Sequence, residues 1–163
     1  MGKKSVRRTR SLSQSSNPVY IAEMLEPRLL LAAQVVISEF MAKNKATLKD
    51  DIGLYSDWIE LHNSGDVTAD LTGWSLTDTQ SNPMEWTFPA GATLAPNAYM
   101  VVWASGLDHK TLGQPFHTNF KMGDEGEYLG LVKPDGTVMQ EYAPTFPPQS
   151  SDISYGLSND SLI

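Results

Sequence analysis

Acidic and imidazole side chains between residues 57 and 78 are the groups in this sequence most suited to chemistry. Asp57, Glu60, His62 and Asp78 carry the oxygen and nitrogen atoms that bind metal ions. Glu60 and His62 are two residues apart, so a strand would place both on one face. The sequence contains neither an EF-hand loop nor an HExxH zinc motif. We therefore interpret these groups as solvated strand faces and turn caps, and predict no metal site.

Two other groupings raise the same question. The run DEGE at residues 124–127 is acidic enough for a calcium loop, but such a run is more typical of a solvated hairpin tip. Ser38, His62 and Asp57 supply the residue types of a hydrolytic triad, yet no nucleophile elbow accompanies them. We predict no catalytic residue and no cofactor, and therefore a protein that is not an enzyme.

The tryptophans offer flat surfaces on which a sugar ring can stack. They are Trp58, Trp74, Trp86 and Trp103. Core packing is the better interpretation of Trp74 and Trp103, and Trp86 is ambiguous. Trp58 alternates with the apolar residues of its run, so it is predicted to point away from the core. Trp58 is therefore the candidate exposed aromatic for contact with a ligand.

The elements that position these side chains are predicted to be strands. Short apolar or alternating runs recur along the chain, separated by clusters of Gly, Pro, Asn and Asp. The predicted strands cover residues 34–40, 57–63, 99–104, 117–122, 128–132 and 138–143. In the first strand, alternation places Val35, Ile37 and Glu39 on one face. This spacing of strands is typical of an all-β sandwich or barrel.

Two runs carry more specific information. Residues 99–104, YMVVWA, are apolar on both faces, which predicts a central strand covered on both sides. In DLTGWSLTD the apolar positions change phase, from Leu71 to Trp74 and Leu76. A strand that keeps its core contacts across such a change needs an extra residue or a bend. We predict a bulge or a sandwich corner at Thr72–Gly73.

Charge divides the chain into two parts. Residues 1–28 hold six Lys and Arg against two Glu, whereas residues 29–163 hold six Lys, no Arg and seventeen Asp and Glu. Nucleic-acid binding needs clustered cations, which the acidic body lacks, so we predict no nucleic-acid partner. The absence of Cys excludes disulfides, thiolate zinc sites and cysteine nucleophiles. The apolar run at residues 29–37 is far shorter than the ~20 residues that span a bilayer, so no transmembrane segment is predicted.

Residues 1–33 are predicted to form a basic leader that is mostly disordered or holds a short helix. Charges interrupt the apolar segment that an ordinary secretion signal requires. The string LEPRLLLA resembles instead the LEPR-x-LL motif found near the N-terminus of many large surface or exported proteins of certain bacteria. The matching residues are Leu25, Glu26, Pro27, Arg28, Leu30 and Leu31. The resemblance implies a protein exported to the cell surface or beyond.

Five blocks of the body, taken in order, resemble the lamin tail domain family. They are VVISEFMAKN, DWIELHNSGD, DLTGWSLTD, WTFPAGATLAPNAYMVVWA and FKMGDEGEYLGLVKPDGTVMQEY. The resemblance covers residues 34–143 and implies an immunoglobulin-like β-sandwich without catalytic residues. Bacterial members look like accessory domains joined to hydrolases or to spore-coat-kinase-like domains. Residues 144–163, rich in Pro and Ser, are predicted to be a tail or linker.

These observations predict a non-enzymatic interaction or structural module of an exported or cell-surface bacterial protein. Its expected partner is a protein or a cell-surface polysaccharide, bound at a sheet face or an edge strand. One alternative is a polysaccharide-binding module that uses exposed aromatics such as Trp58. Another is an accessory fragment of a larger enzyme, kinase-like or hydrolytic, whose catalytic domain lies elsewhere.

Overall fold

The computed structural model describes residues 32–157 of the chain. The predictions for the leader, including its LEPR-x-LL residues, lie outside this range. Among the described residues every regular element is a strand, which confirms the predicted all-β class. None of the described residues belongs to a helix long and apolar enough to cross a membrane.

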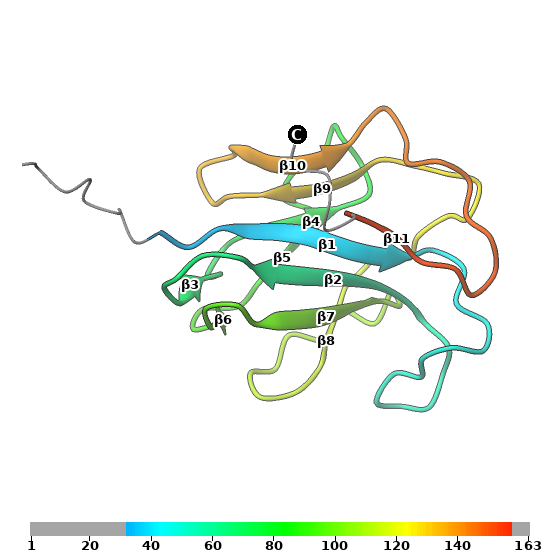
Figure 1. The fold of residues 1–163 in the computed structure, drawn as a ribbon, viewed down its shortest axis with the longest axis horizontal. Helices are drawn as coiled ribbons and strands as arrows, with labels where there is room; N and C mark the ends of the chain where they lie inside the picture. The colour runs from blue at the N-terminus through cyan, green and yellow to red at the C-terminus, as the bar shows by residue number, and fades with distance from the viewer. Residues whose placement is uncertain (1–31, 158–163) are drawn as a thin grey trace, which may run out of the picture. The chain divides into compact units, whose positions relative to one another are not determined.

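The larger of the two main sheets contains five strands in the order β11-β1-β2-β7-β8 (Figure 1). Their bounds are β1 Val35–Met41, β2 Asp57–Asn63, β7 Tyr99–Ala104, β8 Phe116–His117 and β11 Tyr155–Gly156. Neighbouring strands are antiparallel except β7 and β8, which run parallel. The alternation read from the sequence of β2 is confirmed, because Ile59 and Leu61 face the core while Glu60 and His62 face outward.

A four-stranded sheet in the order β10-β9-β4-β5 forms the opposite layer. Its strands are β4 Ser75–Thr77, β5 Trp86–Thr87, β9 Leu129–Val132 and β10 Val138–Tyr142. A separate ribbon pairs β3 Ala69–Asp70 with β6 Thr93–Leu94. The predicted turn KPDG joins β9 to β10, where the Gly136 N–H donates to the Lys133 carbonyl at 2.9 Å.

The core lies between these sheets and draws large side chains from both. Phe40, Ile59 and Leu61 come from the five-stranded sheet. Trp86 and Leu131 come from the four-stranded one. Burying such side chains contributes roughly 1.5–3 kcal/mol each, so this apolar layer is the main source of stability. Trp86, ambiguous from the sequence, is fully buried here.

A bulge in β1 changes which residues face the core. Ile37 pairs with Leu61 but Glu39 pairs with Glu60, so Ser38 is an extra residue in β1. Alternation therefore shifts after Ser38, and Phe40 rather than Glu39 enters the core. The prediction that Glu39 shares the inward face is wrong for this reason. The Gln140 side chain bonds the Ile37 N–H at 2.7 Å and its carbonyl at 3.0 Å, holding the bulge to β10.

The predicted corner at Thr72–Gly73 is confirmed. Before it, β3 belongs to the small ribbon, and after it β4 belongs to the four-stranded sheet. Gly73 has a φ of 72°, a left-handed conformation that glycine adopts without steric cost. The change of apolar phase in the sequence thus marks the point where the chain changes sheets.

The Pro- and Ser-rich segment is not an extended tail over its described part. Phe146 is 1% exposed, and its ring lies 4.8 Å from that of Phe40. Further along, β11 pairs with the end of β1. The prediction of a tail or linker at 144–163 is therefore wrong for residues 144–157. The high content of Pro and Ser led to that prediction, whereas Phe146 and Tyr155 are the side chains that pack this segment on the rest of the sandwich.

Candidate functional site

One row of outward-facing side chains on the five-stranded sheet is unexpectedly buried. Met41, Trp58, Trp103 and His117 lie in register across β1, β2, β7 and β8. We call these residues the covered row. Trp58 is only 8% exposed and packs with Met41 and Trp103 in an apolar cluster of their own. The prediction that Trp58 is an exposed ligand-contact aromatic is therefore wrong, although its strand face was predicted correctly.

The loop of residues 43–56 joins β1 to β2 (Figure 1) and contacts both ends of this row, through Thr47 at Met41 and through Asp51 at His117. Its anchor is the buried side chain of Asn44, which donates to the Leu48 and Ser56 carbonyls and accepts from the Thr47 hydroxyl. The same Thr47 hydroxyl lies 3.3 Å from the sulfur of Met41. Because buried polar groups cost free energy unless they are hydrogen-bonded, these contacts specify one loop conformation.

A second buried side chain, that of Asp50, shapes the far end of the loop. Its carboxylate accepts from the Ile52 and Leu54 N–H groups at 3.1 and 2.8 Å, and from the Ser56 hydroxyl at 2.7 Å. This local network leaves the next residue, Asp51, directed toward β8. Its carboxylate accepts a 2.7 Å hydrogen bond from His117 Nε2.

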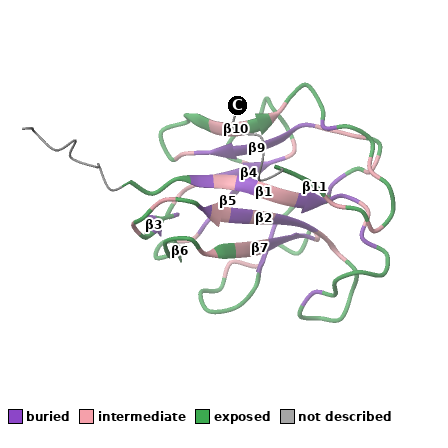
Figure 2. Ribbon diagram, in the orientation of Figure 1, coloured by how far each residue is buried: buried purple, intermediate pink, exposed green. Residues whose placement is uncertain are grey.

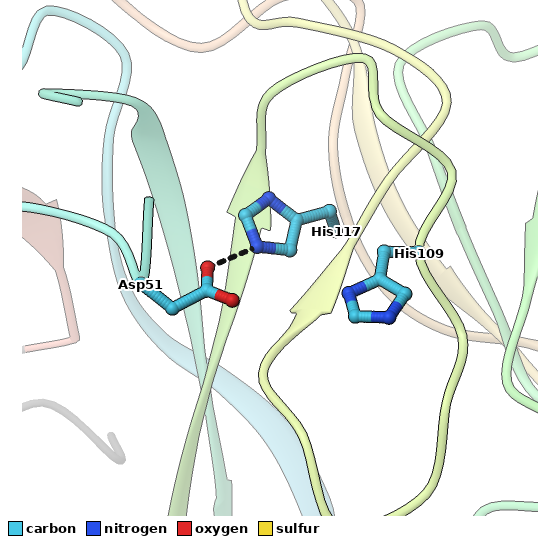
Figure 3. A group of neighbouring side chains, drawn as sticks. All are labelled: Asp51, His109 and His117. Carbon is cyan, nitrogen blue, oxygen red and sulfur yellow. Dashed lines mark hydrogen bonds and ion pairs between the residues drawn. The ribbon is translucent and has the colours of Figure 1, made fainter. Parts of the chain in front are cut away.

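Asp51, His109 and His117 form the most distinctive polar cluster on this face (Figure 3). We call it the Asp–His–His cluster. One ligand atom from each residue lies within 4.8 Å of the others. The main-chain N–H of His117 donates to the His109 carbonyl at 2.9 Å, which fixes the two histidines relative to each other.

Both histidines are oriented by hydroxyl groups. His117 Nδ1 lies 2.8 Å from Ser105 Oγ, and His109 Nε2 lies 3.1 Å from Thr111 Oγ1. His117 is 1% exposed, whereas the Asp51 side chain is 33% exposed. The hydrogen bond with His117 lowers the pKa of Asp51 below its ordinary value, which favours the carboxylate.

The serine, histidine and aspartate here do not form a hydrolytic site. Ser105 contacts Nδ1 of His117, whereas a serine hydrolase places its nucleophile at Nε2 and its carboxylate at Nδ1. Catalysis also requires a substrate to reach the base, and the imidazole is buried. The sequence-based triad fails as well, because the Ser38 hydroxyl donates to Glu60 rather than contacting His62.

The other end of the same sheet face is open. Val36, His62 and Tyr99 lie in register across β1, β2 and β7, and we call them the bare row. Tyr99 is 59% exposed and stacks on the His62 ring with centroids 4.1 Å apart and planes 4° apart. Figure 2 shows β7 passing from exposed at Tyr99 to buried at Ala104. Strand β7 was predicted to be covered on both faces along its whole length. The structure buries both faces only at its C-terminal end, from Val102 to Ala104.

A shallow cavity of about 330 Å³ lies along β7 just after Tyr99, although the bare-row residues themselves do not line it. Met100 and Val101, which follow Tyr99 in β7, form one wall. Residues 91–93 and 112–116 form the remainder. The cavity is lined mostly by apolar and small residues, with Thr93 and Gln114 as polar ones, and holds no titratable side chain, so it suits contact rather than chemistry.

The four residues first considered as metal ligands are divided between two places. Glu60 and His62 face outward, where the Glu60 carboxylate accepts from Ser38 at 2.7 Å and His62 stacks on Tyr99. Asp57 and Asp78 instead adjoin the acidic residue Glu127, whose pKa their charges raise. The four side chains therefore do not converge on one site, and Asp57 accepts from the Asn44 N–H instead of lying on a solvated face.

The acids around Glu127 repel one another. Burial raises the pKa of Glu127, and the charges of Asp78, Asp57 and Glu85 raise it further. Burial also raises the pKa of Asp57. The Asn44 N–H donates to the Asp57 carboxylate and opposes this rise. Lys43 offsets part of this negative charge through its ion pair with Asp124. Glu127 and Asp57 therefore adopt the charged form less readily than free carboxylic acids do.

Sequence reasoning missed the Asp–His–His cluster. The histidines show no ligand spacing of a known motif, and Asp51 stands far from both in the sequence. They meet because β7 pairs with β8 and because the 43–56 loop folds back over the sheet. The only signal in the sequence is that His109 and His117 flank a turn-rich segment, LGQP, that returns the chain on itself.

Comparison with known proteins identifies one family. The family model described as Lamin Tail Domain matches residues 31–145, which is more than half of the chain. The search of curated proteins found no match to this chain. The matched range includes the 43–56 loop, the covered row and the bare row.

Proposed function

Because this chain belongs to the lamin tail domain family, we propose that it is a non-enzymatic interaction module of an exported or cell-surface bacterial protein. Its immunoglobulin-like sandwich is a rigid frame that presents side chains on the outer face of the five-stranded sheet. The partner is a protein or a polysaccharide of the cell surface, and nucleic acids are disfavoured by the acidic body.

The observation that carries this proposal is the bare row. At this end of the sheet face Tyr99 is exposed, and the two residues that follow it in β7, Met100 and Val101, line a shallow cavity of about 330 Å³. Tyrosine is enriched where proteins bind partners, since it combines a large apolar ring with a hydroxyl that hydrogen-bonds. An exposed tyrosine on an open sheet face therefore supports a binding role.

The leader supports the proposed location. Its basic charges and LEPR-x-LL residues resemble the N-terminal segments of exported bacterial proteins. A reporter protein fused to residues 1–33 should leave the cytoplasm of the native host. Substituting Arg28 and Leu30 in that fusion should retain it inside, and export of both fusions alike would refute a role for the motif.

Polysaccharide binding is the second candidate, now centred on Tyr99 instead of Trp58. The Tyr99 ring, held flat against His62, offers the planar apolar surface on which sugar rings stack. This candidate differs from protein binding in its ligand but not in its location on the sheet.

Two experiments on the intact chain separate the candidates. A photo-crosslinking amino acid at position 99 should capture one defined envelope protein if the partner is a protein. The matched control places the crosslinker at Tyr55, which is also exposed but lies on the 43–56 loop. A glycan array tests the alternative, with Tyr99→Ala expected to abolish the signal and Tyr55→Ala to leave it.

A further inference from the structure

We propose that Asp51, His109 and His117 form a binding site for a divalent transition-metal ion, with Zn²⁺ the best match. The bound ion fastens the 43–56 loop to the five-stranded sheet. Asp51 comes from that loop, His117 from β8 and His109 from the segment that precedes β8. The prediction from the sequence was that the protein has no metal site, so this proposal revises it.

The ligand set determines the class of ion. Two imidazole nitrogens and one carboxylate oxygen, within 4.8 Å of one another, match the donors that zinc prefers. Ca²⁺ and Mg²⁺ prefer oxygen ligands throughout, so a site with two histidines selects against them. Three protein ligands leave a fourth tetrahedral position for a water molecule, on the side where Asp51 is exposed to solvent.

The hydroxyl partners of the histidines are the second argument. Metal-bound histidines almost always use their other ring nitrogen to hydrogen-bond a neighbouring group, which sets the orientation of the ring. Here Ser105 holds Nδ1 of His117 and Thr111 holds Nε2 of His109. The remaining nitrogens are His117 Nε2 and His109 Nδ1, and Figure 3 shows both rings facing the Asp51 carboxylate.

The ligand atoms must move to admit the ion, because pairs as far as 4.8 Å apart have to approach one another while the closest pair separates. His117 Nε2 and Asp51 Oδ1 are 2.7 Å apart, a distance that requires a proton between them. With bonds of about 2.0–2.1 Å to zinc, two tetrahedral ligands are about 3.3 Å apart. The metal ion therefore takes the place of the shared proton, and Asp51 retreats by a fraction of an ångström. Its position on a loop makes this movement easy.

A simpler explanation accounts for only part of the cluster. A buried histidine satisfied by a serine and an aspartate needs no third group, and His117 has both partners. That explanation assigns no role to His109, which hydrogen-bonds Thr111 but neither Asp51 nor the His117 ring. The metal proposal does assign one, so His109 is the residue that distinguishes the two explanations.

The test uses the untagged full chain, stripped of metal with a chelator and titrated with ZnCl₂ in a calorimeter. We expect one equivalent to bind with a raised Tm, and Co²⁺ to give the visible absorption of a tetrahedral site. His109→Ala and Asp51→Asn should each weaken binding at least tenfold. The matched control is His62→Ala, because the third histidine lies in the bare row and should leave binding unchanged.

Nitrogen-resolved NMR of the imidazole rings tests the site without any substitution, so it remains decisive if a variant fails to fold. Zinc should shift His117 Nε2 and His109 Nδ1 and leave the His62 nitrogens unmoved. The proposal is overturned if the wild type shows no saturable zinc binding. It is equally overturned if His109→Ala binds as tightly as the wild type, or if His62→Ala weakens binding as much as His109→Ala does.

Discussion

The covered row and the bare row lie on the same face of the same sheet, yet their surroundings are opposite. Trp58 and His62 both point outward from β2, and Trp103 and Tyr99 both point outward from β7. At one end these side chains are buried beneath the 43–56 loop, and at the other Tyr99 is 59% exposed. The difference arises from a loop that Asn44 and Asp50 fold, not from the strands themselves. A strand's alternation therefore tells which face a residue occupies, but not whether that face is wet.

The largest effect should follow truncation in the covered row. Trp58→Ala removes a side chain that packs on Met41 and Trp103, so it should cost about 3–5 kcal/mol of unfolding free energy. Urea unfolding followed by circular dichroism measures this cost. A change below about 1 kcal/mol would mean that Trp58 is solvated as first predicted, and the contrast between the rows would disappear.

Loosening the loop should have the next largest effect. Asn44→Ala removes hydrogen bonds to the Leu48 and Ser56 carbonyls, and each buried group left without a partner costs about 1–3 kcal/mol. Hydrogen exchange should quicken across residues 43–56 while the core strands keep their protection. Asn82→Ala, at an exposed asparagine, serves as the control and should change neither stability nor exchange.

Truncation in the bare row should have a modest effect. Tyr99→Ala removes only a cross-strand stack on His62, and such pairs contribute roughly 0.2–1 kcal/mol. The same urea series measures it beside Trp58→Ala. Equal losses from the two substitutions would show that the rows are covered alike.

The smallest effect is expected in the pH dependence of stability, at Glu127. Burial raises the pKa of Glu127, so the folded protein holds that proton more tightly than the unfolded chain does. This contribution to stability is complete below the unfolded pKa of about 4.3 and is lost as pH rises through the higher folded pKa. Glu127→Gln should therefore reduce the fall in stability between acid and neutral pH and leave the protein at least as stable at pH 7. A steeper fall in the variant would contradict the assigned direction.

Much of the fold was predictable because local rules and global architecture agree. Alternation in β2, the turn at KPDG and the corner at Thr72–Gly73 each follow from steric preferences of a few residues. The bulge at Ser38 did not follow, because it is held by the Gln140 side chain from a strand remote in the sequence. Phe146 and Tyr155 were missed for a related reason, since the prolines and serines around them dominate the composition.

The candidate site was less predictable than the fold. The Asp–His–His cluster depends on pairing between β7 and β8 and on the conformation of the 43–56 loop. Neither can be read from the spacing of Asp51, His109 and His117. Residues of the unbulged strand β2, by contrast, were placed on the right face. Sequence patterns constrain neighbours along the chain well, and they constrain the loop that lies over a sheet hardly at all.

Residue-resolved hydroxyl-radical footprinting of the folded chain tests the central claim most directly, because it compares the two rows in one sample. Tryptophan is intrinsically more reactive than tyrosine toward this probe. If the 43–56 loop covers one half of the sheet face, Trp58 and Trp103 should be strongly protected and Tyr99 readily modified. Modification of Trp58 as fast as that of Tyr99 would contradict the account.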